Sequence, residues 1–111
     1  MNILTVCHGN VCRSVLAQGF LARALADMEA QVATLACFPV TKQVADNVYL
    51  LCSRGIQAEP GHAASPEVRL GLGWSGIVLQ GHRSRILTVD DLRQADLILV
   101  AEQSQIDFMK R

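Results

Sequence analysis

The fold is set near the N-terminus by the stretch Ile3-Leu4-Thr5-Val6-Cys7-His8-Gly9-Asn10-Val11-Cys12-Arg13-Ser14. Its apolar beginning, residues 3–6, is typical of a buried parallel strand. A glycine-containing turn follows, and from Ser14 to about Ala30 the chain has the periodicity of an amphipathic helix. The expected apolar face of this helix consists of Leu16, Phe20, Leu21, Ala24, Leu25 and Met28. A strand that passes through a tight turn into a helix predicts the beginning of an α/β fold.

Strand and helix signals alternate through the rest of the chain. Residues 48–52 predict a second strand that is closed by residues 53–55, and residues 96–100 form the clearest strand of the sequence. Helices are expected to begin at Ser65, before a proline, at Thr88, which has an acidic residue three positions later, and near Ser104. Residues 31–47 fit either a strand or a continued helix. The alternation predicts an open parallel sheet flanked by helices, and the length of 111 residues predicts a single domain, 1–111.

The composition excludes several classes of protein. Half of the residues are hydrophobic, which excludes intrinsic disorder, and ten Lys and Arg balance ten Asp and Glu. A net charge of zero gives no reason to expect nucleic acid or an anionic membrane as a partner. Because there is neither a long apolar run nor a basic secretory leader, we expect a cytoplasmic protein with reduced cysteines. The four cysteines and three histidines lack the paired spacing of zinc ligands, so no metal site is expected.

The turn after the first strand predicts an anion site. Backbone N–H groups of a loop that leads into a helix can converge on one phosphate-sized anion, and Gly9 and Asn10 suit the backbone angles of such a loop. The planar guanidinium of Arg13 can hold two anion oxygens. These positive surroundings favour the thiolate of Cys7, to which Ser14 could donate a hydrogen bond. The segment therefore predicts a sulfur nucleophile facing a bound phosphoryl group, although Cys7 as a buried hydrophobe and Arg13 as a surface charge is the plainer alternative.

A family resemblance supports the first interpretation. The run Cys7-His8-Gly9-Asn10-Val11-Cys12-Arg13-Ser14 resembles the active-site loop of the low-molecular-weight protein-tyrosine phosphatases, whose pattern is Cys-x-Gly-Asn-x-Cys-Arg-Ser. Weaker similarity continues through residues 53–56, 60–66, 81–92 and 96–100. The resemblance implies that Cys7 is the nucleophile and that Arg13 clamps the phosphate. The implied phosphate-binding residues are His8, Gly9, Asn10, Val11, Cys12 and Arg13.

The resemblance also implies supporting residues and a substrate class. The residues implied to hold the loop in shape are Asn10, Ser14, Ser53 and His82. Cys12 would be a redox partner that forms a reversible disulfide with Cys7. The implied reaction is the hydrolysis of a phosphotyrosine protein or a small aryl phosphate through a phospho-cysteine, without a cofactor and with phosphate ion as a ligand. The apolar Val11 is more similar to tyrosine-directed members than to those with Thr, which favour phosphoarginine.

The sequence departs from the family pattern in its C-terminal part. Family members have an Asp-Pro segment that supplies a general acid, followed by a last strand and helix, whereas these 111 residues contain no Asp-Pro dipeptide. General acid–base catalysis contributes typically about 10²- to 10⁴-fold to a rate. The resemblance therefore implies a C-terminally short domain, a sheet that could lack its last strand, and a weak phosphatase. An open apolar edge at residues 96–100 would favour a homodimer.

Two other functions fit parts of the sequence. A relative without the general acid could bind phosphate or a phosphoprotein and not turn it over. A thiol-dependent arsenate reductase resembles the same fold and loop, but it needs further cysteines as resolving thiols. Cys37 and Cys52 lie in apolar runs and are expected to be buried and unreactive, so they are poorly placed for that role.

Overall fold

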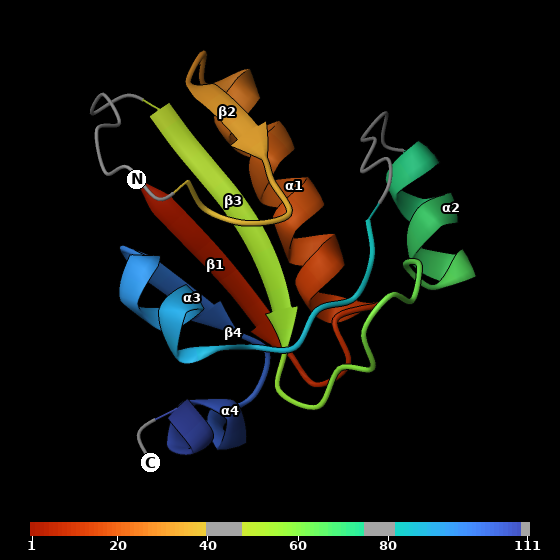
Figure 1. Ribbon diagram of the computed structural model, residues 1–111. Coiled ribbons are helices and arrows are strands. Elements are labelled where there is room, and N and C mark those ends of the chain that lie inside the picture. The colour runs from red at the N-terminus through yellow and green to blue at the C-terminus, as the bar shows by residue number, and fades with distance from the viewer. Residues whose placement is uncertain (40–47, 75–81, 110–111) are drawn as a thin grey trace.

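The computed structural model describes residues 1–39, 48–74 and 82–109 of the chain (Figure 1). Within these ranges one sheet is formed by β1 (Asn2–Cys7), β2 (Gln31–Thr34), β3 (Val48–Gly55) and β4 (Leu97–Val100). Its strands are all parallel and lie in the order β2-β3-β1-β4. The expected open parallel sheet is therefore confirmed. The segment 31–47 begins as a strand, and its residues 40–47 lie outside the described ranges.

Helices flank this sheet on both faces. They are α1 (Arg13–Asp27), α2 (Pro66–Trp74), α3 (Val89–Gln94) and α4 (Gln103–Met109). Helix α1 packs against β1, β2 and β3 and also contacts α2, whereas α3 contacts β1 and α4 contacts β4. Figure 1 shows α1 and α3 on opposite faces of the sheet, which confirms the expected layered α/β architecture. None of the helices in the described ranges is long and apolar enough to span a membrane.

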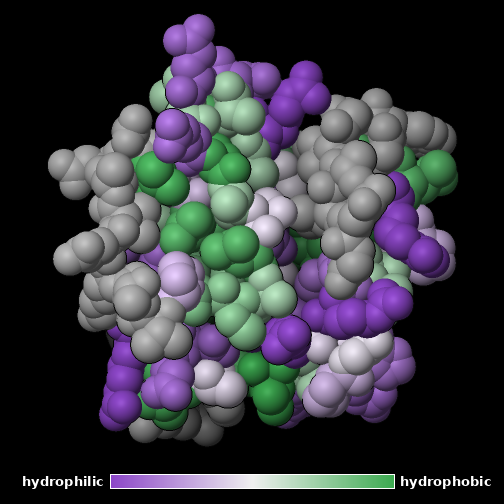
Figure 2. Space-filling model, turned by 45° about the horizontal axis from the view of Figure 1, so that its top comes forward, coloured by the Kyte–Doolittle hydropathy of each residue, from purple (hydrophilic) through white to green (hydrophobic). Residues whose placement is uncertain are grey.

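The side chains of β1 alternate between the two faces of the sheet. Leu4 and Val6 belong to a buried cluster against which Leu92 of α3 packs, whereas the hydroxyl of Thr5 donates a hydrogen bond of 2.8 Å to the carbonyl of Ser14 in α1. A second cluster joins α1 to α2 and consists of Val15, Ala64, Val68 and Leu72. Figure 2 shows that hydrophobic side chains also gather near the middle of one face of the molecule. Since β1 is buried on both faces, the position of its last residue is fixed by packing.

The predicted inner face of α1 is wrong in part. Phe20 is 48% exposed and Met28 is 76% exposed, and the helix ends at Asp27 instead of near Ala30. The buried residues of α1 are Ser14, Val15, Gln18 and Gly19. A polar contact helps to determine which face of α1 is buried, because the side-chain amide of Gln18 donates a hydrogen bond of 3.0 Å to the carbonyl of Leu51 in β3.

Strand β3 extends further than the sequence predicts. Ser53, Arg54 and Gly55 do not close the strand but belong to it, and all three are buried. They pair in register with residues 5–7 of β1, so the hydrogen-bonding ladder carries the strand through a segment that has the composition of a turn. The last residues of β1 and β3, Cys7 and Gly55, therefore lie side by side at the carboxyl edge of the sheet.

The predicted helix starts agree with the structure within one residue. Helix α2 begins immediately after Ser65, and α4 begins at Gln103 instead of Ser104. Helix α3 begins with a capping box, in which Thr88 accepts a hydrogen bond from the Asp91 amide and Asp91 accepts one from the Thr88 amide. This cap fixes the chain that returns to the sheet before β4.

Candidate active site

The sulfur of Cys7 lies inside the loop that connects β1 to α1. Cys7 is the last residue of β1 and is buried. Its sulfur lies 3.0 Å from the hydroxyl oxygen of Ser14 and accepts a hydrogen bond of 3.3 Å from the backbone N–H of Asn10. Because α1 begins at Arg13, the sulfur also faces the positive end of a helix dipole. The structure thus brings Cys7, Asn10 and Ser14 together as the sequence predicts.

Asn10 holds the loop from within. It is fully buried and has a φ of 57°, a left-handed backbone conformation that Asn tolerates better than most residues. Its side-chain amide donates to the Ser14 hydroxyl at 3.0 Å, and its side-chain oxygen accepts from the backbone N–H of Arg85 at 2.8 Å. A ring nitrogen of His82 lies 2.8 Å from its carbonyl oxygen. Asn10 therefore links the loop to the distant segment 82–85.

The carbonyl groups of the loop are occupied from outside. Backbone N–H groups of Ile56, Gln57 and Ser65 donate to the carbonyls of Cys7, His8 and Val11 at 3.0, 2.9 and 2.8 Å. In the described part of the chain, by contrast, the N–H groups of Gly9, Val11 and Cys12 donate to no protein acceptor. A loop with its carbonyls bound and several amides unused can bind an anion through those amides.

Gly55 allows the end of β3 to approach this loop closely. A Cβ atom at residue 55 would lie 2.7 Å from the carbonyl oxygen of His8 and 2.8 Å from the backbone nitrogen of Asn10. Both neighbours are backbone atoms and cannot move aside without changing the loop. Position 55 therefore needs a glycine because a larger residue would collide with the loop, and not because of the backbone angles of Gly55.

Arg13 begins α1, and its guanidinium is half-exposed. Its Nη1 lies 2.7 Å from an oxygen of Glu102, and the two side chains are 49% and 52% exposed. The hydrogen bond from Arg13 is the main reason why the pKa of Glu102 lies below its ordinary value. Sequence reasoning missed Glu102, although an acidic residue two positions after the predicted strand 96–100 was a possible signal, because ligand sites form at the carboxyl ends of parallel strands.

Of the two remaining residues predicted to support the loop, His82 and Ser53, only His82 has a side-chain atom within hydrogen-bonding distance of the described part of the loop. His82 does contact it, through the carbonyl of Asn10. Burial lowers the pKa of His82 more than this hydrogen bond raises it, and the nearby Arg54 and Arg83 lower it further. Ser53 is buried in β3 opposite Thr5, but its side chain makes no hydrogen bond to any described residue of the loop.

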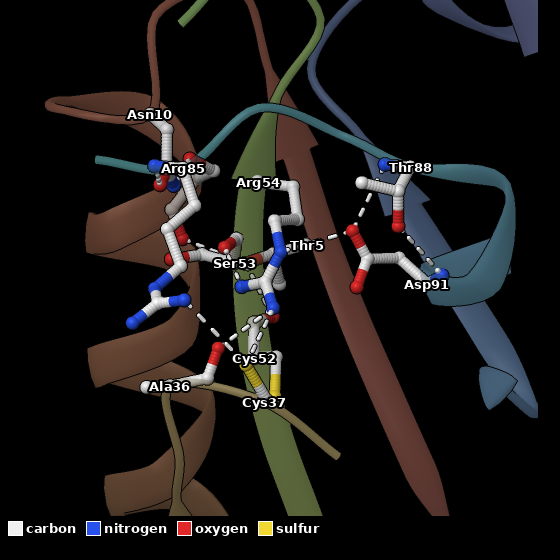
Figure 3. Close-up of polar contacts among 11 residues, drawn as sticks. Thr5, Asn10, Ala36, Cys37, Cys52, Ser53, Arg54, Arg85, Thr88 and Asp91 are labelled. Atoms are coloured by element: carbon white, nitrogen blue, oxygen red, sulfur yellow. Dashed lines mark hydrogen bonds and ion pairs between the residues drawn. The ribbon is translucent and has the colours of Figure 1, made fainter. Parts of the chain in front are cut away.

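A buried ion pair joins β3 to α3 (Figure 3). Arg54 is 4% exposed, and its Nε donates to Asp91 at 3.0 Å. Its other nitrogens donate to the carbonyls of Ser53 and Ala36, each at 2.7 Å. Since Asp91 also caps α3, this arginine joins β3, the segment after β2, and α3. No periodic pattern predicts the pair, because Arg54 is part of the predicted turn.

The four cysteines fall into two classes. Cys7 and Cys52 are buried, whereas Cys12 and Cys37 are exposed. The prediction that Cys37 is buried is therefore wrong. Its segment leaves the sheet after β2, and its sulfur accepts long hydrogen bonds of 3.6 Å from Arg54 and Arg85. Cys52 is buried as predicted, and burial raises the pKa of its thiol to about 12.

Comparisons with known proteins agree with the loop geometry. Residues 2–111 match the family model described as low molecular weight phosphotyrosine protein phosphatase. The probable low molecular weight protein-tyrosine-phosphatase AmsI of Erwinia amylovora is 31% identical over 110 residues, which are 99% of this chain and 62% of that protein. The chain thus spans about three fifths of the length of such relatives.

Two solved structures illustrate the similarity. The tyrosine phosphatase Wzb from Escherichia coli K30, in complex with sulphate, superimposes with a TM-score of 0.70 at 29% identity, covering 99% of this chain and 62% of that one. The arginine phosphatase YwlE from Geobacillus stearothermophilus gives a TM-score of 0.70 at 26% identity, covering 97% of this chain and 56% of that one.

Proposed function

Because the chain belongs to the low molecular weight phosphotyrosine protein phosphatase family, we propose that it hydrolyses aryl phosphate monoesters through a phospho-cysteine on Cys7. The observation that carries this proposal is the place of the sulfur. It lies in the loop at the N-terminus of α1, within hydrogen-bonding distance of the Asn10 amide and the Ser14 hydroxyl. Both groups favour a sulfur that carries negative charge.

The proposed reaction has two balanced steps. In the first, the thiolate of Cys7 attacks phosphorus, an S–P bond forms, and the bond from phosphorus to the aryl oxygen breaks with its electron pair on that oxygen. In the second, water attacks phosphorus, the S–P bond breaks with its electron pair on the Cys7 sulfur, and inorganic phosphate leaves with the protons of the water. Arg13 and the unused loop amides would stabilise the phosphoryl oxygens in both steps. The Ser14 hydroxyl would stabilise the thiolate when it is the leaving group.

We propose that proton donation to the aryl oxygen is weak. Among the carboxylates that the structure describes, only Glu102 forms an ion pair with one of the predicted phosphate-binding residues, Arg13. Arg13 lowers the pKa of Glu102, so this group is a carboxylate at neutral pH and has no proton to donate. Substrates whose leaving group needs little protonation should therefore react fastest, and less acidic phenols such as tyrosine should be released more slowly.

Turnover of p-nitrophenyl phosphate tests the proposal. We expect hydrolysis that the Cys7→Ser variant loses by at least about a thousandfold, because the nucleophile is removed. The matched control is Cys37→Ser, which changes an exposed thiol outside the loop and should retain the wild-type rate. Phosphate binding without hydrolysis would instead indicate a relative that binds and does not turn over. Equal rates for wild type and Cys7→Ser would contradict the proposal.

A series of leaving groups tests the proposed weakness of acid catalysis. Without protonation the rate should fall steeply as the aryl oxygen becomes more basic, so p-nitrophenyl phosphate should react at least about 100-fold faster than phenyl phosphate. Similar rates for the two esters would show that an acid assists departure.

We further propose phosphotyrosine as the substrate side chain. A cavity of about 570 Å³ adjoins the loop, and Val11 lines it together with Gly9 and Ser65. The methyl groups of Val11 offer an apolar contact to an aromatic ring. A phosphotyrosine peptide should therefore be hydrolysed with a higher kcat/KM than phosphoarginine, and the opposite order would refute this assignment.

We also propose that two chains associate through β4. This strand lies at an edge of the sheet that the described residues form, and Leu97 and Leu99 on it are 42% and 39% exposed. Light scattering over a range of concentrations should show a dimer. A monomer at every concentration would exclude it.

A further inference from the structure

The topology of the sheet brings Glu102 to the phosphate-binding loop. Strand β4 pairs with β1 in parallel, with Val100 beside Val6, and the backbone N–H of Ala101 continues this pairing to the carbonyl of Val6 at 3.1 Å. The chain therefore leaves β4 at the same edge at which β1 enters the loop (Figure 1). Glu102 is the second residue after β4, and its Oε1 lies 2.7 Å from Nη1 of Arg13.

A buried side chain fixes the backbone from which Glu102 projects. Gln105 is 4% exposed, and its side-chain oxygen accepts hydrogen bonds from the N–H groups of Ala101 and Glu102 at 2.9 and 3.0 Å. These two hydrogen bonds hold the backbone at the turn into α4, although the Glu102 carboxylate itself is half-exposed. An exposed ion pair contributes little to folding stability, so stability alone gives no reason for this arrangement.

We infer that Glu102 is a positioning residue for Arg13, an inference that rests on the proposed function. A guanidinium has five N–H donors in a rigid plane, and one such donor meets Glu102. Glu102 is the sole partner of the Arg13 side chain among the described residues, so the Nε and Nη2 donors are unused. By holding one edge of the plane, Glu102 directs the other edge toward the oxygens of a phosphoryl group in the loop.

The test combines three variants with two readouts. Glu102→Ala removes the acceptor, Glu102→Gln keeps an acceptor without the charge, and Arg13→Lys replaces the planar fork. The readouts are kcat and KM for p-nitrophenyl phosphate and the Kd of inorganic phosphate from calorimetry. The matched control is Asp27→Ala, which removes a carboxylate from the exposed pair with Arg23 on the same helix as Arg13.

If Glu102 acts by positioning Arg13, the effect of Glu102→Ala should depend on whether residue 13 is Arg or Lys. In the wild-type background Glu102→Ala should lower kcat/KM by about tenfold and raise the phosphate Kd severalfold, because a misplaced group loses catalytic contact. Glu102→Gln should stay within about threefold, because the amide oxygen still accepts from the guanidinium. In the Arg13→Lys background Glu102→Ala should change both readouts by less than about twofold, because non-additivity marks residues that act as one unit. The Asp27→Ala control should match wild type.

The outcomes separate this inference from the proposed function. Glu102→Ala at the wild-type level, or with the same loss in both backgrounds, would overturn the inference even if hydrolysis depends on Cys7. Coupled phosphate binding without hydrolysis would support the inference and refute the proposed function. A wild-type protein that neither binds phosphate nor hydrolyses the ester would refute both.

Discussion

At the scale of the residue, Asn10 shows how much of the loop depends on one side chain. It uses its side chain toward Ser14 and Arg85, its carbonyl toward His82, and its amide toward the Cys7 sulfur. A residue at φ 57° also carries a backbone cost that glycine avoids. Substitutions at position 10 can therefore separate the stability contributed by the side-chain hydrogen bonds from the cost of the backbone conformation.

We expect Asn10→Ala to lower the free energy of unfolding by about 2–4 kcal/mol, because it removes two buried hydrogen bonds and leaves their partners unpaired. Asn10→Gly loses the same bonds but avoids the left-handed strain, so it should be more stable than Asn10→Ala by about 1 kcal/mol. Urea denaturation measures both differences. Equal stability of the two variants would show that the backbone conformation is not costly at this position.

Gly55 gives a second prediction for a single residue. Gly55→Ala places a methyl group against backbone atoms of His8 and Asn10, which should cost about 1–3 kcal/mol by overpacking and should reduce phosphate binding with it. The matched control is Gly71→Ala in α2, where an added Cβ meets no atom of the described residues outside its own helix within 4 Å, and where alanine favours a helix. Thermal melting and phosphate titration measure the two effects. A Gly55→Ala protein that binds phosphate as tightly as the wild type would contradict the close packing of Gly55 against the loop.

At the scale of the element, the buried pair of Arg54 and Asp91 ties α3 to the sheet. Asp91→Asn leaves the Arg54 guanidinium buried without a full counter-charge, and such a change costs about 3–5 kcal/mol. Thr88→Ala removes only the other half of the capping box and should cost about 1 kcal/mol. The denaturation midpoints of both variants test whether Asp91→Asn is the more destabilising change. A loss for Asp91→Asn no larger than that for Thr88→Ala would mean that the pair does not act as a buried one.

The helices and strands also show which parts of the fold can be predicted from the sequence. Residues 3–14 are contiguous, so a strand, a turn and a helix start could be predicted from them alone. The end of β3 could not, because Ser53, Arg54 and Gly55 are held in the strand by pairing with β1 and not by their own propensities. The buried face of α1 was mispredicted for a similar reason: Gln18 is buried because Leu51 offers it an acceptor.

The same distinction applies to the site. The loop residues Cys7, Asn10 and Ser14 were predicted correctly to lie together because they are close in sequence. Glu102 reaches Arg13 only because β4 lies beside β1, a strand order that the chain does not reveal locally. Ser53 shows the converse, since the family resemblance implied a loop-supporting hydrogen bond that its side chain does not make to the described residues of the loop.

At the scale of the whole molecule, His82 makes stability depend on pH. Burial lowers its pKa in the folded state below the ordinary value of 6.5, so the unfolded chain binds the proton more readily. The contribution of neutral His82 is therefore present above the unfolded pKa and is lost as pH falls through the folded one. Between pH 7 and about pH 5.5 the wild-type melting temperature should fall more than that of His82→Gln.

The control for this prediction is His62→Gln, which changes an exposed histidine outside the loop. The fall of its melting temperature over the same pH range serves as the reference for removing an imidazole from the surface. A His82→Gln protein whose melting temperature falls in parallel with that of the wild type would show that proton uptake by His82 does not contribute.

The central claim is that the loop presents the Cys7 sulfur to a phosphoryl group, and the covalent intermediate tests it most directly. Wild-type protein mixed with p-nitrophenyl phosphate is quenched rapidly, digested and analysed by mass spectrometry. We predict one added phosphoryl group on the peptide that contains Cys7, with no such cysteine adduct on the peptides that contain Cys37 or Cys52. Steady release of p-nitrophenol with an unmodified Cys7 at every quench time, and with the same rate in Cys7→Ser, would contradict the account.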